Sequence, residues 1–529
     1  MGRRIKAARW SGLLAALSSH AVAQAPARTA PPQPAAGGTH ALPRDVVPRF
    51  EPVLRDSFPV QLGKNDRTET GYLVVYEDRA RPGGRTIRLP VAIVRSRSAA
   101  PAPDPVVYTA GGPGSSSLSA AQYAGAYRFL DTRDLIVMEQ RGTRHARPVL
   151  ECSEVGASKR EGALRGLDAP DRAALDAAAA ARCRARLVAS GVDPAAYTTA
   201  ASAADLEDLR RALRIPRWNL YGVSYSTRVM LAVLRDYGAT VRSAVLDSPL
   251  PASVRYDDAS VGHFAGALDA VLRDCDAQPA CRAAYPDLRA RFYAALAAAD
   301  ARPLALTVRS PADSSAVPLA LRGAALARLV ALDNNWALPY LPRMMDRIAR
   351  RDTAALREAV ERTLSPDDGF AWGMRYSVWC SEEAPYARRT PAAAQRGSRP
   401  ELAGLDPSPA PPAVCAAWRV PPAPARDTVA VRSAVPVLLL SGAYDPETPP
   451  AWAAEAARTL PNARALTLPG MSHVPTQMWD APCAMQAAAA FVDDPTRDPP
   501  AGPAGACLAA LRPPAFVTPQ PEPPRAGTR

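Results

Sequence analysis

Histidine is scarce in this sequence, and long apolar runs are absent after the N-terminus. The 529 residues include five histidines and eight cysteines, with no C-x-x-C pair and no cluster of histidines. Because zinc sites usually need such ligand clusters, we expect neither a metal nor another cofactor. No stretch beyond the N-terminus is long and apolar enough to span a bilayer, so we expect no membrane insertion of the mature chain.

A clustered stripe of basic residues is also missing, although the formal net charge is +13. The arginines are spread along the chain and interleaved with acids, and several basic residues lie in a segment that we expect to be removed. A dispersed excess of this kind aids solubility but does not track phosphates. We therefore expect no nucleic-acid partner.

The N-terminus has the pattern of a secretory signal peptide. A basic start is followed by a short apolar run around Leu13–Leu17 and by the small-x-small site Ala21-Val22-Ala23. We expect a signal at 1–23, a disordered Pro/Ala-rich leader at 24–48 and a secreted or periplasmic protein. The alternative interpretation is a disordered basic arm.

All eight cysteines follow the signal: Cys152, Cys183, Cys275, Cys281, Cys380, Cys415, Cys483 and Cys507. An even number in an exported chain indicates disulfides. Pairing neighbours would close short local loops (152–183, 275–281, 380–415 and 483–507), although the sequence alone does not fix the connectivity.

Short apolar strands alternate with helix-like segments in two parts of the chain. This rhythm predicts an α/β fold with a mostly parallel sheet and helices on both faces, preceded by an antiparallel hairpin at 71–77 and 85–94. Between the two parts the pattern is mostly helical, which indicates an inserted cap. The expected boundaries are a core at 49–250 and 430–512, a helical cap at 251–429 and a Pro-rich tail at 513–529.

The segment 218–223 predicts a short strand, and Ser224 follows it on an abrupt turn before a helix. In Gly222-Val223-Ser224-Tyr225-Ser226 the small neighbours permit the tight turn of a nucleophile elbow, which lifts a serine hydroxyl out of the sheet. The usual pattern is G-x-S-x-G, and Ser226 stands at the position of the second glycine. Ser224 is therefore a candidate nucleophile.

A serine hydroxyl needs a base, and that base needs an orienting carboxylate. His473 is the one histidine that immediately follows a predicted core strand; the others lie in the signal, the leader, an arginine-rich loop and the cap (His20, His40, His145 and His263). Asp445 follows the preceding strand and is the expected orienting acid, with Glu447 as the less favoured choice. The order Ser224, Asp445, His473 matches a known arrangement of such triads.

An oxyanion formed by this attack needs preorganised donors. One expected donor is the backbone N–H of Tyr225, directly after the nucleophile. The second should come from the glycine-rich loop after the strand at 106–109, where Gly111 and Gly112 let the backbone approach a substrate closely.

These motifs resemble one known family. Gly111-Gly112-Pro113-Gly114, Glu139-Gln140-Arg141-Gly142-Thr143, the elbow, Ser441-Gly442-x-x-Asp445 and Gly470-Met471-Ser472-His473 follow the order found in the secreted tripeptidyl aminopeptidase and prolyl iminopeptidase group of α/β-hydrolase serine peptidases. The resemblance spans about residues 50–511. It implies an α/β-hydrolase fold, the triad and oxyanion hole named above, and a helical cap that closes over the substrate.

Some positions depart from the family pattern. Ser226 replaces a glycine, Glu139 replaces the usual aspartate, Arg144 stands where glycine is common, and Ala110 stands where prolyl iminopeptidases have histidine. The last departure favours the tripeptidyl type, or a relative of it, over a strict prolyl iminopeptidase. For the free amine of a substrate we expect a cap carboxylate, with Glu382 and Glu383 as candidates because a disulfide at Cys380 could fix their loop.

The sequence thus predicts a secreted serine hydrolase, an aminopeptidase that releases N-terminal residues or short peptides through an acyl-enzyme on Ser224. Its partners would be peptide, small ester or amide substrates. One alternative is a carboxylesterase or amidase that uses the same triad. The other is a non-catalytic binding protein that keeps the fold.

Overall fold

The computed structural model describes residues 47–63, 66–165, 167, 169–310, 314–364, 369–388, 399–402, 404–405, 408–497 and 502–519. The expected signal peptide, nearly all of the leader and the end of the tail lie outside the described residues. Within the described ranges, no helix combines the length and the apolar character needed to cross a membrane.

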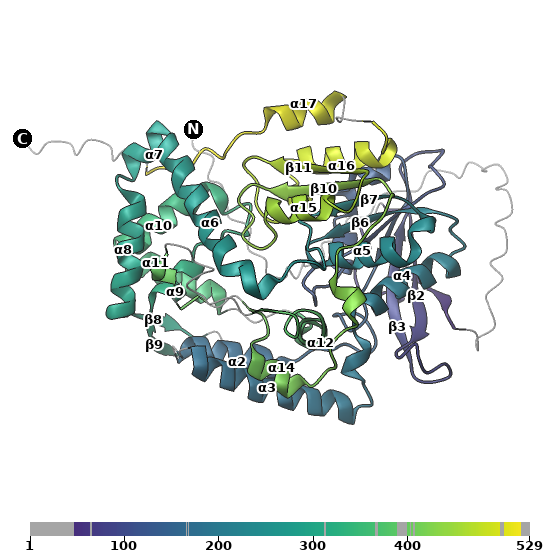
Figure 1. Cartoon of the computed structure of the whole chain (residues 1–529), viewed down its shortest axis with the longest axis horizontal. Coiled ribbons are helices and arrows are strands. Elements are labelled where there is room, and N and C mark those ends of the chain that lie inside the picture. Colours follow the sequence, from purple (N-terminus) through teal and green to yellow (C-terminus); the bar gives the residue numbers. More distant parts are fainter. Residues whose placement is uncertain are drawn as a thin grey trace, which may run out of the picture. The chain divides into compact units, whose positions relative to one another are not determined.

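In the described part of the chain nine strands form one sheet, in the order β1-β2-β3-β5-β4-β6-β7-β10-β11 (Figure 1). Neighbours from β1 to β5 in this order pair antiparallel, and those from β5 to β11 pair parallel. The strands are β1 (Arg49–Val53), β2 (Thr68–Tyr76), β3 (Thr86–Val94), β4 (Val106–Thr109), β5 (Leu135–Met138), β6 (Trp218–Val223), β7 (Val241–Asp247), β10 (Val437–Gly442) and β11 (Ala463–Leu468).

Helices cover both faces of the sheet, because the parallel strands are apolar on both sides. On β6, Leu220 belongs to a core with α4, α5 and α15, whereas Tyr221 belongs to a core with α1 and α16. These helices are α1 (Leu118–Ala121), α4 (Thr199–Ala212), α5 (Tyr225–Tyr237), α15 (Pro450–Ala457) and α16 (Cys483–Asp493). The predicted α/β-hydrolase architecture is confirmed.

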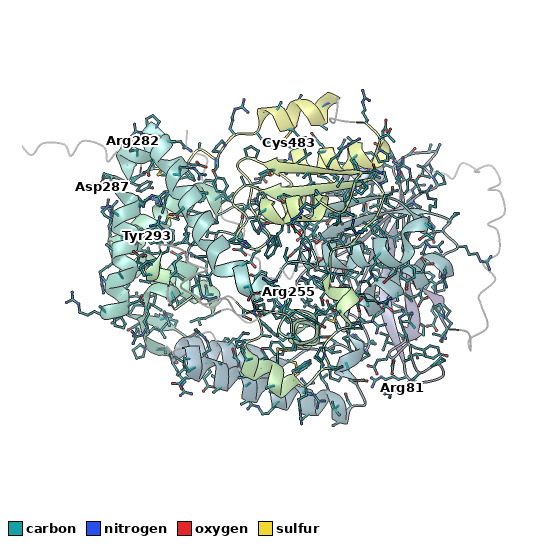
Figure 2. All side chains as sticks on the ribbon, in the orientation of Figure 1. Arg81, Arg255, Arg282, Asp287, Tyr293 and Cys483 are labelled. Atoms are coloured by element: carbon teal, nitrogen blue, oxygen red, sulfur yellow. A yellow bond between two sulfur atoms is a disulfide. The ribbon has the colours of Figure 1, made fainter. Side chains whose placement is uncertain are left out.

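The segment between β7 and β10 is mostly helical, as expected, and has an apolar core of its own. Buried Phe292 and Tyr293 on α8 belong to this core, and Figure 2 shows Tyr293 within these helices. The elements are α6 (Tyr256–Ala277), α7 (Pro279–Ala284), α8 (Leu288–Ala301), α9 (Gly323–Arg328), α10 (Leu341–Ala349), α11 (Thr353–Thr363), α12 (Trp372–Glu382), α14 (Pro412–Trp418) and a hairpin of β8 (Leu304–Arg309) and β9 (Ala316–Leu321). The sequence pattern did not predict this hairpin.

Two further helices, α2 (Ser153–Leu164) and α3 (Ala169–Ala189), lie beside α14 in Figure 1. They come from a part of the chain that we assigned to the core, yet α3 packs against α14 of the inserted segment. The domain boundaries given above therefore stay a prediction. Their placement matters for function, because α2 and α3 form one wall of the cavity described below.

The start of the Pro-rich tail is attached to the helical segment. The side chain of Phe516 is buried, the N–H of Val517 donates to the carbonyl of Pro339 at 2.8 Å, and the Tyr285 hydroxyl donates to the carbonyl of Val517 at 2.7 Å. Residues 513–519 are thus part of the folded structure.

Four disulfides join neighbouring cysteines, and they are the four pairs that the sequence suggested. Cys152–Cys183 ties the start of α2 to α3, and Cys380–Cys415 ties α12 to α14. Cys275–Cys281 joins α6 to α7, and Cys483–Cys507 joins α16 to α17 (Gly502–Ala510), with Cys483 visible in Figure 2.

A buried arginine joins the hairpin, the sheet and α4. Arg141 donates to both carboxylate oxygens of Asp205 at 2.7 Å, and it also donates to the carbonyls of Glu77 and Ala196 at 2.8 and 2.7 Å. Neither side chain of the Arg141–Asp205 pair is exposed to solvent. Removing Arg141 would leave the buried carboxylate of Asp205 with only the partly exposed Arg79 as a charged partner.

We therefore expect Arg141→Met to lower the free energy of unfolding by about 3–5 kcal/mol, measured by urea denaturation. The matched control is Arg362→Met, which breaks the exposed helix pair between Arg362 and Glu358 and should cost less than about 1 kcal/mol. Equal effects of the two substitutions would contradict this account of Arg141.

Candidate active site

Ser224 occupies the turn between β6 and α5 with φ 54° and ψ −131°. A positive φ is costly for a residue with a Cβ, so the surroundings must impose it. The N–H of Ser224 donates to the carbonyl of Asp247 at 2.9 Å, and a Cβ on Gly222 would lie 2.8 Å from Cγ of Met230. The elbow thus has the geometry that the sequence predicted.

Ser226, which replaces the second elbow glycine, is fully buried and fastens the turn. Its hydroxyl accepts the N–H of Val223 at 2.7 Å and lies 2.7 Å from the carbonyl oxygen of Thr109, to which it can donate. Because Thr109 ends β4, this hydroxyl links the elbow to the strand that leads into the glycine-rich loop. The serine at this position therefore adds a hydrogen bond between the elbow and β4 that a glycine could not form.

The glycine-rich loop approaches the elbow as closely as the sequence suggested. A Cβ on Gly111 would lie 2.7 Å from Cβ of Ser224, so only glycine fits there. The guanidinium of Arg375 on α12 donates to the carbonyls of Gly112 and Pro113 at 3.0 and 3.2 Å. The inserted segment thus holds the loop whose N–H groups, with that of Tyr225, remain the predicted oxyanion donors.

Asp445 and His473 come together at the same edge of the sheet. Oδ2 of Asp445 lies 2.9 Å from Nδ1 of His473, and Oδ1 accepts the N–H groups of Glu447 and Thr448 at 2.8 and 2.9 Å. The Thr448 hydroxyl donates to Oδ2 at 2.8 Å. A proton on Nδ1 shared with Asp445 leaves Nε2 as the basic nitrogen. Glu447, the less favoured acid, instead accepts the Tyr256 hydroxyl at 2.5 Å.

The loop that carries His473 is held from two sides. Asn335, in the inserted segment, accepts the N–H of Ser472 and donates to the carbonyl of His473, both at 2.6 Å. On the core side, the Ser248 hydroxyl accepts the N–H of Val474 at 2.9 Å, and Asp247 accepts the N–H of Thr476 at 2.8 Å. Burial raises the pKa of Asp247 to about 6, against the hydrogen bonds from Thr476.

Sequence reasoning did not identify Thr448 or Asn335 as site residues. Thr448 stands three residues after Asp445 in the same loop, so the spacing of an Asx turn could have indicated it. Asn335 carries no such signal, because it is separated from His473 by more than a hundred residues and touches it only in the fold.

Glu382 and Glu383 do not reach this site, contrary to the expectation for a substrate amine. Glu382 accepts the N–H and the hydroxyl of Thr199 at 2.7 and 2.5 Å, and Glu383 forms a buried ion pair with Arg228. Both carboxylates are buried and engaged by the protein itself, because α12 directs them towards α4 and α5.

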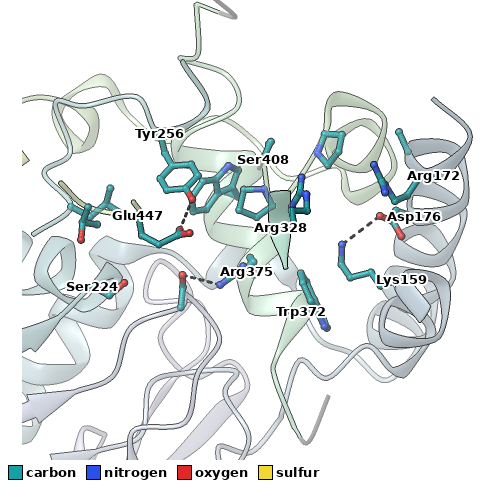
Figure 3. A pocket seen from close by; sticks show the side chains of 17 residues that line it. Lys159, Arg172, Asp176, Ser224, Tyr256, Arg328, Trp372, Arg375, Ser408 and Glu447 are labelled. Atoms are coloured by element: carbon teal, nitrogen blue, oxygen red, sulfur yellow. Dashed lines mark hydrogen bonds and ion pairs between the residues drawn. The ribbon is translucent and has the colours of Figure 1, made fainter. Parts of the chain in front are cut away.

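A cavity of about 400 Å³ opens beside Ser224 (Figure 3). Its near end carries Ser224, Glu447 and Tyr256, and its far end carries side chains of α2 and α3. The remaining lining residues include Gly112, Leu250, Trp372, Arg375, Trp379 and Thr448. The carboxylate of Glu447 is therefore the acidic group that lies at the same end of this cavity as Ser224.

The electrostatics of the Asp445–His473 pair favour a positively charged His473 in the protein without substrate. Burial lowers the pKa of His473, but the charge and hydrogen bond of Asp445, together with Glu447, outweigh it and raise the pKa to about 9. The pKa of Asp445 is lowered despite its burial, because His473 and Thr448 stabilise the carboxylate.

A strained serine elbow, an adjoining glycine loop and an Asp–His pair at the carboxyl edge of a parallel sheet define a serine hydrolase with the α/β-hydrolase fold. Residues 104–318 match the family described as alpha/beta hydrolase fold, and residues 408–503 match the family described as TAP-like protein. The chain has the fold of the α/β hydrolases, and the two matches support a place in their TAP-like group.

Several known proteins are similar to this chain. Serine protease Hip1 of Mycobacterium tuberculosis, and the same protein of Mycobacterium bovis, are 25% identical over 409 residues, covering 72% of this chain and 76% of the relative. Among solved structures, the proline iminopeptidase of Mycobacterium smegmatis is 14% identical, with a TM-score of 0.37, covering 80% of this chain and 98% of that one. A thermophilic esterase of Thermogutta terrifontis is 16% identical, with a TM-score of 0.35, covering 80% and 99%.

The pKa of His473 predicts alkaline activity. A general base must be neutral, so kcat/KM for an ester substrate without a free amine should rise with pH through an apparent pKa of about 9 and then level off. Glu447→Gln removes one negative charge that raises this pKa, so it should move the rise to lower pH. The control is Glu358→Gln, on the exposed face of α11. An unchanged profile in Glu447→Gln, or a plateau reached below pH 6, would contradict this account.

Proposed function

We propose that the chain is a secreted serine aminopeptidase that releases N-terminal residues or short peptides through an acyl-enzyme on Ser224. One observation carries the choice of a free-amine substrate: the Glu447 carboxylate lines the same cavity as Ser224. A half-buried carboxylate forms strong, charge-assisted hydrogen bonds with an ammonium group. The relatives described as serine protease Hip1 support a peptidase over an esterase.

In the proposed mechanism Oγ of Ser224 attacks the carbonyl carbon of the scissile amide, and Nε2 of His473 takes the hydroxyl proton. The oxyanion is stabilised by N–H groups of the Gly111–Gly112 loop and of Tyr225. His473 then gives its proton to the leaving nitrogen, the C–N bond breaks, and the acyl-enzyme forms. Water, deprotonated by His473, attacks the ester and releases the N-terminal product.

Asp445 orients His473 throughout this cycle and stabilises the imidazolium. Thr448 fixes Asp445 in turn, since its N–H and its hydroxyl donate to the two carboxylate oxygens. Arg375 and Ser226 keep the glycine-rich loop against the elbow.

Glu447 takes the role that the sequence pattern suggested for Glu382 and Glu383. Its backbone N–H is held by Asp445 at 2.8 Å and its carboxylate by the hydroxyl of Tyr256 at 2.5 Å. Burial raises the pKa of Glu447. An incoming ammonium would favour the ionised form and would gain the most from this desolvated position.

Secretion is supported by two independent features of the chain. The N-terminal residues have the basic, apolar and small-residue order of a signal peptide. Four disulfides link all eight cysteines, which is typical of proteins that fold in an oxidising compartment.

The proposal is tested with three substrates: a free-amine peptide amide, its N-acetylated form and a simple ester. We expect kcat/KM for the free-amine peptide to exceed that for the acetylated form. Glu447→Gln should reduce the ratio of the free-amine value to the acetylated value about 10- to 100-fold, as for the loss of a hydrogen bond to a charged group, because a shift in the His473 pKa affects both substrates alike.

The control for this experiment is Glu455→Gln, which removes a carboxylate of α15 that pairs with Arg458 outside the cavity. It should keep the preference for the free amine. If the wild-type protein hydrolyses the acetylated peptide as well as the free one, the aminopeptidase proposal is wrong, and ester hydrolysis alone would identify an esterase.

A further inference from the structure

The wall of the cavity opposite Ser224 is basic. Lys159 on α2 and Arg172 on α3, which we call the basic wall, line it together with Asp176 of α3. Figure 3 shows these three side chains at the far side of the cavity from Ser224 and Glu447. Neither helix was expected to contribute to the site.

Positive charge exceeds negative charge over the described lining of this cavity. The cations are Lys159, Arg172, Arg328 and Arg375, and the carboxylates are Asp176 and Glu447. The two carboxylates lie at opposite ends, so the near end is acidic and the far end is basic (Figure 3). A cleft lined by one sign of charge concentrates ligands of the opposite sign.

Asp176 neutralises only part of the basic wall. One of its oxygens accepts the Ser158 hydroxyl, and the other lies 3.4 Å from Nζ of Lys159. Among the described residues no carboxylate forms an ion pair with Arg172, and no side chain accepts a hydrogen bond from it. Burial and the charges of Arg375 and Arg172 lower the pKa of Lys159, against the attraction of Asp176.

The basic wall is held in place by the fold. The ammonium of Lys159 lies 4.5 Å from the ring centre of Trp372, and the guanidinium of Arg375 lies 5.4 Å from the same centre. The disulfide Cys152–Cys183 fixes α2 against α3. Arg375 also holds the carbonyl of Gly112, so one row of side chains connects the basic wall to the loop beside Ser224.

We propose that the basic wall binds a carboxylate group of the peptide substrate while the scissile carbonyl lies at Ser224. This inference rests on the proposed peptidase function, because the anions that a peptide carries are its acidic side chains and its C-terminus. Arg172 supplies a planar pair of donors that matches a carboxylate, and Lys159 adds a second positive charge. The protein thus selects short acidic peptides, or peptides with an acidic residue close to the cleaved bond.

The test measures binding to Ser224→Ala protein by calorimetry, so it does not depend on turnover. Three free-amine tripeptides separate the two sources of the carboxylate: Ala-Ala-Gln amide, Ala-Ala-Glu amide and Ala-Ala-Gln with a free C-terminus. One of the two carboxylate peptides should bind about tenfold more tightly than the amide without a carboxylate, as for one hydrogen bond between charged groups. The peptide that binds more tightly shows whether the basic wall binds a side-chain carboxylate or the C-terminal carboxylate.

Arg172→Gln, added to Ser224→Ala, should abolish this gain, and Arg172→Lys should restore part of it. The matched control is Arg182→Gln, which removes the same charge from an exposed position of α3 outside the cavity lining. Urea midpoints of the variants check that the fold is retained. Higher salt should weaken the gain in the parent protein.

The inference is wrong if neither carboxylate peptide binds more tightly than Ala-Ala-Gln amide. It is also wrong if the Arg172→Gln variant keeps the same increase in affinity for the carboxylate peptide as the Arg182→Gln variant. Its failure is distinguishable from failure of the proposed function. If the Ser224→Ala protein shows no tighter binding of either carboxylate peptide while the wild-type enzyme still prefers free-amine substrates, only the inference about the basic wall is wrong. Equal hydrolysis of free and acetylated peptides would instead contradict the aminopeptidase proposal.

Discussion

The hydrogen bond between the buried carboxylate of Asp445 and Nδ1 of His473 is the interaction on which the candidate site depends. Asp445 and His473 lie on the loops that follow the neighbouring parallel strands β10 and β11. Their hydrogen bond requires these two strands to end at the same edge of the sheet as β6, which leads into the elbow. Much of the surrounding structure maintains this arrangement. Thr448 holds Asp445, Asn335 and Asp247 hold the histidine loop from opposite sides, and a Cβ on Gly442 would overlap the backbone of Ser472.

The helical segment takes part in this arrangement, beyond covering it. Asn335 reaches the histidine loop from one part of the segment, and Arg375 reaches the glycine-rich loop from another. Both contacts cross from the inserted segment to the core, so a shift of the segment would move the candidate base and the predicted oxyanion donors together. The walls of the cavity also come from both parts, so the same shift would change the shape of the cavity.

The parts of the structure that depend on local pattern could be predicted from the sequence. Strand 218–223, the strained turn at Ser224 and the loops at Asp445 and His473 follow from apolar runs and glycines. The spacing of the cysteines suggested the four disulfide pairs but did not fix them. Asn335, Arg172 and Lys159 could not be predicted, because the chain brings them to the site only through packing of distant helices. Glu382 and Glu383 were misplaced for a related reason: proximity to Cys380 says nothing about which face of α12 they occupy, and they lie towards Thr199 and Arg228.

Labelling with a fluorophosphonate, followed by mass spectrometry of the modified peptide, tests the central claim most directly. The account predicts a single adduct on Ser224, no adduct in Ser224→Ala, and labelling slowed at least about a hundredfold in His473→Ala because the hydroxyl then lacks its base. Ser226→Ala, which keeps the nucleophile, should still be labelled. An adduct that persists in Ser224→Ala, or one that forms on another residue of the wild-type protein, would contradict the account.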